Sequence, residues 1–233
     1  MGLFYESEKT FEDLMNEKKN FIFIGEAGSG KSEIVLNVAA MLAERTGKKV
    51  ELFDLDQTKP LYRSRDMAEA FAKKGVQIHF QEQFQDAPTS VGGVMTSLMG
   101  DGYTLLDIGG GHQAARMAGS YCHLLAKDNS VPVYIVNPYR PWSKDVDGID
   151  GTMQHILSSV RLDHIYILAN PNLGYTTTVD EFTHGLDKID ELFEGYTAVN
   201  SACVRKEIYE EAQAQTDKKL LPIELYLTYE WVD

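Results

Sequence analysis

Residues 25–32 read Gly-Glu-Ala-Gly-Ser-Gly-Lys-Ser, and this stretch decides the expected fold. It follows the apolar run 21–24 and precedes an amphipathic stretch that begins at Glu33. In that position the pattern GxxxxGK[ST] is typical of a phosphate-binding loop, the Walker A motif. Its glycines let the backbone curl so that successive N–H groups point at phosphate oxygens. The sequence therefore predicts a strand, a nucleotide-binding loop and a helix in direct succession.

The loop pattern also predicts roles for single residues. Lys31 is expected to contact the β and γ phosphates and to act in catalysis, and the hydroxyl of Ser32 is expected to bind Mg²⁺. The helix that follows would favour bound phosphate through its N-terminal dipole. The predicted nucleotide-binding residues in and beside the loop are Gly25, Glu26, Ala27, Gly28, Ser29, Gly30, Lys31, Ser32 and Glu33.

Length and charge limit the class of protein. The 233 residues fit one domain over 1–233, with a core at about 20–202 and a C-terminal extension at 203–233. A net charge of −13 disfavours sequence-independent binding to nucleic acid. No run of eighteen apolar residues occurs, and the segment 220–233 carries acidic rather than basic residues. We therefore expect a soluble cytoplasmic protein that binds neither nucleic acid nor membranes.

Short apolar runs alternate with helical patterns along the chain, which is typical of repeated βα units around a mainly parallel sheet. The helix after the loop is expected to end at Gly47, and further helical patterns cover 61–74, 114–126, 144–159, 179–193 and 205–214. The predicted strands are 21–24, 50–53, 76–80, 104–108, 133–136, 165–169 and 196–199. The segment after residue 220 is expected to be a strand or a tail that packs on the body or on a partner.

Acidic residues follow two of these strands. Ligands of open α/β sheets bind beyond the carboxyl ends of the strands. Asp54 and Asp56 are therefore candidates to hold a Mg²⁺-bound water or to orient the water that attacks the γ-phosphate, although either can also cap the next turn. Asp107 is predicted to be the acidic partner of Mg²⁺, and Gly110 would let the backbone approach the γ-phosphate.

Two other strand ends carry candidate ligands. Asn170 and Pro171 follow the run 165–169, where an asparagine amide can offer both a donor and an acceptor to a nucleotide base. Arg140 follows the run 133–136 in an aromatic, proline-rich segment, where it can contact phosphate or a partner carboxylate or remain solvated.

The loop, the two acidic strand ends and the late asparagine together resemble the SIMIBI class of P-loop NTPases, and within it the MinD/ParA/CobQ type. The resemblance covers about residues 20–202. It implies a three-layer α/β P-loop NTPase fold with a mostly parallel seven- or eight-stranded sheet, ATP (or ADP) with Mg²⁺, and commonly a homodimer. By resemblance, Asp54 or Asp56 is the switch I carboxylate, Asp107 is the Walker B acid, and 109–112 is switch II.

One position departs from the resemblance. Relatives of the MinD/ParA type usually carry a second lysine early in the loop, which reaches the nucleotide of the other subunit, and here that position is Glu26. This loop therefore supplies no lysine to a dimer partner. A cluster of Cys or His residues, typical of metal-delivery relatives, is also missing from the sequence.

Three functions stay open from the sequence. The first is a Mg²⁺-dependent ATPase that acts as a nucleotide-controlled switch on an unidentified protein partner. The second is a small-molecule kinase or ligase in which Arg63, Arg65 or Arg140 closes over the acceptor. The third is a regulatory module that binds nucleotide with little turnover.

Overall fold

The computed structural model describes residues 4–55, 62–80, 92–109, 119–126, 128–143 and 162–227, together with 149, 151, 153, 154, 157 and 158. Of residues 62–66 and 142 it describes the backbone alone. Two predicted site residues, Asp56 and Gly110, lie outside the described residues.

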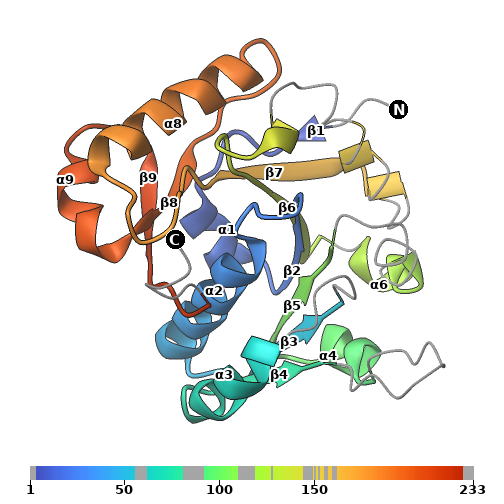
Figure 1. Cartoon of the computed structure of the whole chain (residues 1–233). Helices are drawn as coiled ribbons and strands as arrows, with labels where there is room; N and C mark the ends of the chain where they lie inside the picture. Colours follow the sequence, from blue (N-terminus) through green and yellow to red (C-terminus); the bar gives the residue numbers. More distant parts are fainter. Residues whose placement is uncertain are drawn as a thin grey trace.

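The described strands form one sheet, and every pairing in it is parallel (Figure 1). Eight strands follow the order β4-β3-β5-β2-β6-β7-β8-β9, and β1 pairs with the start of β7. The strands are β1 Phe4–Tyr5, β2 Asn20–Ile24, β3 Val50–Asp54, β4 Val76–His79, β5 Tyr103–Asp107, β6 Ser130–Val136, β7 His164–Ala169, β8 Ser201–Arg205 and β9 Lys219–Ile223. The predicted α/β fold with a parallel sheet is confirmed.

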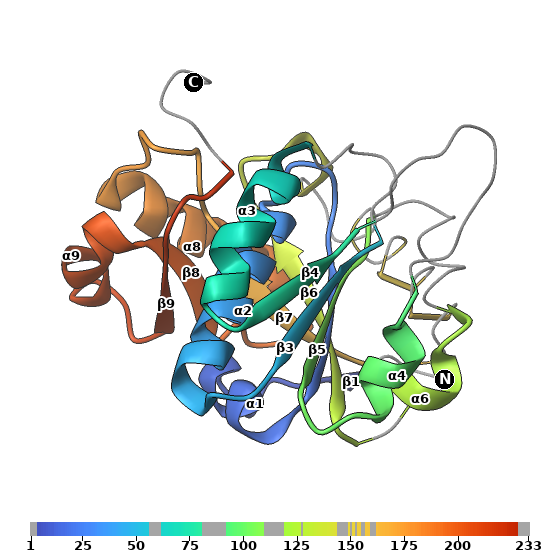
Figure 2. The same ribbon diagram turned by 90° about the horizontal axis from the view of Figure 1, so that it is seen from below.

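Helices cover both faces of the sheet, which gives three layers. In Figure 2, α2 and α3 lie on one side of the strands, and α4 and α6 lie on the other. The first face carries α1 Phe11–Glu17, α2 Lys31–Thr46 and α3 Tyr62–Lys73. The second face carries α4 Val94–Met99, α6 Cys122–Leu125, α8 Val179–Phe193 and α9 Tyr209–Gln213. Each side therefore has its own apolar core.

The central strand β2 shows why the sequence folds in this way. Phe21 and Phe23 point into the core beneath α1 and α2, whereas Ile22 and Ile24 point into the core beneath α8. All four side chains are fully buried. A parallel strand inside the sheet is covered on both faces, so residues 21–24 are all apolar instead of alternating with polar residues.

Local signals fix the ends of the two long helices. Gly47 ends α2 in the left-handed conformation, at a φ of +63°, and its N–H donates to the carbonyl of Ala43. Thr178 and Glu181 form a capping box at the start of α8. Both predicted helices are confirmed, and α8 has the predicted bounds 179–193.

The predicted strand 196–199 is wrong. The chain leaves α8 through a turn at Gly195, at a φ of +80°, and the N–H groups of Tyr196 and Thr197 both donate to the carbonyl of Phe193. Tyr196 is 57% exposed, so the apolar run there is not a buried strand. The strand begins later, at Ser201, where the chain meets its neighbour β9.

The predicted helix 205–214 is shorter and divided. Arg205 ends β8, and a 3₁₀ turn, η2 Lys206–Ile208, precedes α9. Of the predicted helix 114–126 the structure describes the end, including α6, and most of the predicted helix 144–159 lies outside the described residues. The elements α1, α4 and β1 were not predicted; each is short, and β1 has two residues.

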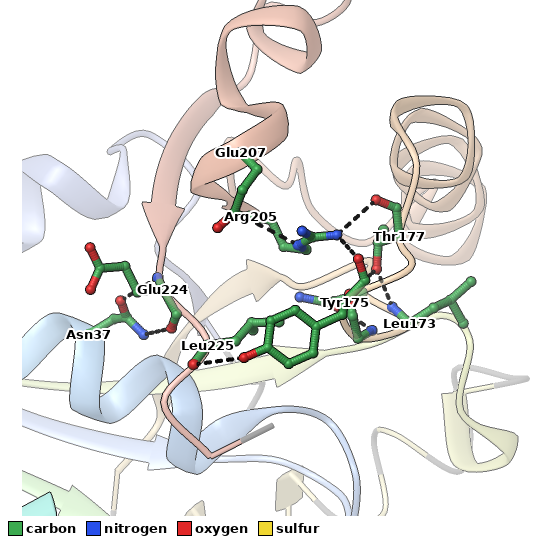
Figure 3. Close-up of polar contacts among 10 residues, drawn as sticks. Asn37, Leu173, Tyr175, Thr177, Arg205, Glu207, Glu224 and Leu225 are labelled. Carbon is green, nitrogen blue, oxygen red and sulfur yellow. Dashed lines mark hydrogen bonds and ion pairs between the residues drawn. The ribbon is translucent and has the colours of Figure 1, made fainter. Parts of the chain in front are cut away.

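Residues 224–227, which follow β9, pack on the body of the protein, in agreement with one of the two predictions for the C-terminal segment. Figure 3 shows this segment beside α2 and the chain after β7. The Asn37 amide pairs with both backbone groups of Glu224, each at 2.8 Å, and the Tyr175 hydroxyl donates to the carbonyl of Leu225 at 3.5 Å. The ring of Tyr226 meets Phe71 of α3 edge-on, with centroids 5.1 Å apart. Residues 224–227 thus connect α2 with α3.

Candidate nucleotide-binding site

The loop between β2 and α2 has the backbone that its glycines allow. Gly28 and Gly30 have φ values of +79° and +87°, a region that residues with a Cβ rarely adopt. At Gly25 a Cβ would lie 2.7 Å from the Ser29 hydroxyl and 3.0 Å from the carbonyl oxygen of Ile135. The loop can therefore pass close to β6 because residue 25 has no side chain.

One carboxylate brings together the two functional side chains at the start of α2. The ammonium of Lys31 lies 2.5 Å from Oδ1 of Asp107, and the Ser32 hydroxyl donates to Oδ2 of Asp107 at 2.7 Å. The side chains of Lys31 and Asp107 are 6% and 3% exposed, so the ion pair is shielded from water. The residues predicted as Walker A lysine, Mg²⁺ ligand and Walker B acid thus lie in direct contact.

The second acidic residue stands beside this cluster. Asp54 and Asp107 are direct partners in the register of β3 and β5. Partners in adjacent parallel strands point to the same face, and the residues two positions earlier, Leu52 and Leu105, lie in the core on the α2 side. Both carboxylates therefore lie on the face that carries the loop helix.

These groups fit a nucleotide with Mg²⁺. The hydroxyl of Ser32 and the carboxylate of Asp107 would supply the hard oxygen ligands that Mg²⁺ prefers, and Asp54 beside Asp107 would hold a water bound to the ion. Phosphate oxygens would supply further ligands. The hydroxyl of Ser29, inside the loop, is buried and has no hydrogen-bond partner among the described residues. A buried polar group of this kind is more stable when a ligand supplies the missing hydrogen bond.

Asn170 reaches the loop itself. Its Nδ2 donates to the carbonyl of Ser29 at 2.7 Å, while its Oδ1 is buried and has no partner in the described part of the chain. An N–H group of a nucleotide base would therefore find its acceptor in Oδ1, whereas Nδ2 is already bonded to the loop. Pro171 packs against Gly185 of α8, where a Cβ on the glycine would lie 2.4 Å from the proline Cβ.

Other residues of the predicted set differ in what they contact. The carboxylate of Glu33 accepts hydrogen bonds from the backbone N–H groups of Tyr226 and Leu227, so this side chain is bonded to the C-terminal segment. Glu26 is half-buried and Ala27 is exposed. Burial raises the pKa of the Tyr134 hydroxyl, and the negative charge of Glu26 raises it further, so this tyrosine remains neutral beneath the loop.

One contact in the site could not be predicted from the sequence. Arg140 donates from Nε to the carbonyl of Gly28 at 2.9 Å. Arg140 follows the apolar run 133–136 closely, which identified it as a residue near a strand end. No local pattern indicated that its partner would be a carbonyl of the loop.

The comparison with known families agrees with this geometry. The model of the CobQ/CobB/MinD/ParA nucleotide binding domain matches residues 21–194. The chain belongs to this family. The matched range contains the loop, both acidic strand ends and Asn170. No curated protein matches the sequence significantly.

The chain is also similar to several solved structures. FtsY from Mycoplasma mycoides has a TM-score of 0.50 and 18% identity, over 77% of this chain and 58% of that chain. A nucleotide-binding protein from Archaeoglobus fulgidus in complex with ADP has a TM-score of 0.49 and 13% identity, over 88% and 90%. The 54 kDa signal recognition particle protein from Aeropyrum pernix in complex with GDP has a TM-score of 0.41 and 16% identity, over 90% and 45%.

The likeness to FtsY concerns the fold alone. The chain spans 58% of the FtsY structure and 45% of the signal recognition particle structure. In the part of the chain that the structure describes, no helix has the length and apolar character needed to cross a membrane.

Proposed function

We propose that the protein is a Mg²⁺-dependent ATPase whose nucleotide state acts as a switch on a protein partner. The cluster of Lys31, Ser32 and Asp107 supports this proposal most directly. It places an ammonium, a hydroxyl and a carboxylate in contact at the N-terminus of α2, where phosphate binding is favoured.

The chemistry would rest on positioning and charge. Lys31 would exchange Asp107 for the phosphate oxygens, and the loop N–H groups would hold those oxygens in place. Mg²⁺, bound by Ser32 and Asp107, would neutralise charge that develops on the phosphates. Asp54 would orient the attacking water from its place beside Asp107.

The positions of the two carboxylates support the proposed switch. Asp54 and Asp107 are the last residues of β3 and β5, so a change at the γ-phosphate would reach the chain that leaves both strands. Hydrolysis would then alter the affinity for a partner that contacts these segments.

The test is a binding and turnover assay on the purified chain. Lys31→Ala should lower MgATP affinity at least tenfold in calorimetry, because the ammonium that neutralises the phosphates is removed. Lys218→Ala is the control, since Lys218 is also a largely buried lysine in an ion pair, with Asp190 at 2.7 Å, outside the site. Equal affinities for Lys31→Ala and the unchanged protein would contradict the proposal.

Turnover distinguishes the proposed switch from the other two functions. Phosphate release from ATP without any added acceptor, with GTP measured in parallel, is the expected result. ADP formation that requires a small-molecule acceptor would instead indicate a kinase or ligase. Tight binding with no ADP formation would indicate a regulatory module.

A further inference from the structure

Two side chains from outside the loop hold consecutive carbonyl groups inside it. Arg140 Nε donates to the carbonyl of Gly28 at 2.9 Å, and Asn170 Nδ2 donates to the carbonyl of Ser29 at 2.7 Å. They follow β6 and β7, whereas Asp107 ends β5 on the opposite side of β2. The loop is thus held from one side by carbonyl contacts and contacted from the other by the Asp107 cluster.

Each of these side chains lies against a glycine with positive φ. A Cβ on Gly28 would lie 3.4 Å from Arg140 Nε, and a Cβ on Gly30 would lie 2.3 Å from Asn170 Nδ2. The second distance is shorter than any real Cβ contact. The two glycines therefore provide the turn and also leave the space that Arg140 and Asn170 fill.

The direction of a carbonyl fixes the direction of the next N–H. In a planar trans peptide the C=O of one residue and the N–H of the next point in opposite directions. By holding the Ser29 carbonyl, Asn170 turns the Gly30 N–H away from itself. By holding the Gly28 carbonyl, Arg140 orients the Ser29 N–H, which closes a turn on the carbonyl of Glu26 at 3.1 Å.

Hydrogen bonds connect the two segments that carry Arg140 and Asn170. Asn137 is 2% exposed, and its amide donates to the carbonyl of Asn172 at 2.8 Å, which joins the segment after β6 to the segment after β7. The N–H of Arg140 donates to the carbonyl of Asn137 at 3.2 Å, and the N–H of Asn170 donates to the carbonyl of Val136 at 2.8 Å. The two donors are therefore fixed relative to each other.

We propose that Arg140 and Asn170 are positioning residues that fix the backbone of the loop before the nucleotide arrives. Asn170 orients the Gly30 N–H for phosphate, and Arg140 holds the turn that the Ser29 N–H closes on Glu26. Donors that are already oriented need no reorganisation when the anion binds. This inference rests on the proposed nucleotide binding and adds two residues that act through the backbone of the loop.

The experiment uses pairs of variants that keep or remove the donor. Arg140→Gln places an amide nitrogen as far along the side chain as the Arg140 Nε but carries no charge, whereas Arg140→Met has similar length and no donor. Asn170→Asp keeps the shape of the side chain and replaces the donor by an acceptor. Arg45→Met and Asn200→Ala are remote controls, because Arg45 pairs with Glu12 and the Asn200 amide donates to the carbonyl of Ser7.

Two measurements are made on each variant: MgADP affinity by calorimetry and the amide resonance of Gly30 by NMR without nucleotide. We expect Arg140→Met and Asn170→Asp to weaken MgADP binding about five- to tenfold. We expect Asn170→Asp to shift the Gly30 amide resonance, and Arg140→Gln and both controls to bind like the unchanged protein. The donor contacts would then account for the loss.

Three results would overturn the inference. One is unchanged MgADP affinity in Arg140→Met and Asn170→Asp. Another is an equal loss in Arg140→Gln and Arg140→Met, which would assign the effect of Arg140 to its charge. The third is an unshifted Gly30 amide in Asn170→Asp. If the unchanged protein bound no nucleotide, the proposed function would fail, and the Gly30 resonance would still test the carbonyl contact.

Discussion

At the scale of single residues, the site depends on close contacts between a few side chains and the loop. Lys31 and Ser32 each contact one of the two carboxylate oxygens of Asp107. The side chain of Asn170 occupies the space that a Cβ on Gly30 would need. The local pattern of the loop indicated Gly30, Lys31 and Ser32, and the ends of two predicted strands indicated Asp107 and Asn170. The clearest test at this scale compares two glycines that share the left-handed conformation but differ in their surroundings.

Gly30→Ala and Gly47→Ala are such a pair. The φ values are +87° at Gly30 and +63° at Gly47. A Cβ on Gly47 would have no atom within 4 Å, whereas a Cβ on Gly30 would collide with Asn170. We expect Gly47→Ala to cost about 1–2 kcal/mol of unfolding free energy. Gly30→Ala should cost more and should also remove MgADP binding. Urea unfolding and calorimetry measure both, and equal stability with retained binding in Gly30→Ala would refute the described loop geometry.

At the scale of elements, residues 224–227 connect the end of β9 with α2 and α3. Asn37 of α2 pairs with the backbone of Glu224, and Glu33 of α2 accepts hydrogen bonds from the N–H groups of Tyr226 and Leu227. The ring of Tyr226 contacts α3. The Glu224 carboxylate is itself stabilised, since Lys206 and the hydroxyl of Tyr226 lower its pKa. Strand β9 therefore continues into a segment that packs against the helix of the nucleotide loop.

Asn37→Ala tests this connection. It removes both hydrogen bonds to the backbone of Glu224 and leaves those groups without their partner, which should cost about 1–3 kcal/mol of unfolding free energy. Amide hydrogen exchange of Glu224 and Tyr226 should become faster. Asn37→Asp keeps the acceptor for the Glu224 N–H and should show a smaller loss. Unchanged exchange in Asn37→Ala would mean that this amide does not hold the segment.

At the scale of the whole molecule, ligand binding and folding are linked. A ligand that binds only the folded chain stabilises it by about 2.7 kcal/mol at a hundred times its Kd. The loop, β3, β5 and the chain after β7 all contribute to the proposed site, so a bound nucleotide would stabilise several distant parts of the chain together.

Thermal unfolding with nucleotide measures this linkage. Saturating MgATP should raise the Tm by roughly 5–10 °C, and EDTA should remove part of that gain. In Asp107→Asn the addition of Mg²⁺ to ATP should produce little further rise, because the carboxylate proposed to bind the ion is gone. The comparison uses the increment over each protein's own ligand-free Tm, since the substitution also breaks a buried ion pair. An equal Mg²⁺ increment in both proteins would make the assignment of Asp107 wrong.

The fold was largely predictable because its signals are local. Buried parallel strands require continuous apolar runs, and glycines and capping residues mark the ends of α2 and α8. The predicted strand 196–199 failed because the pattern there is equally typical of a partly exposed turn. The short elements α1 and β1 were missed because seven and two residues are too few to show a clear periodicity, although Thr10 and Asp13 form a capping box at the start of α1.

The sequence by itself determined the loop, the helix that follows it and the acidic ends of two strands, because each depends on the backbone preferences and periodicity of a few adjacent residues. Tertiary structure alone decided the contacts among them. Lys31 meets Asp107 across 76 positions because β5 pairs with β2, and Asn170 meets Ser29 across 141 positions because β7 lies next but one to β2. Strand order is set by how the whole core packs, and no local pattern encodes it.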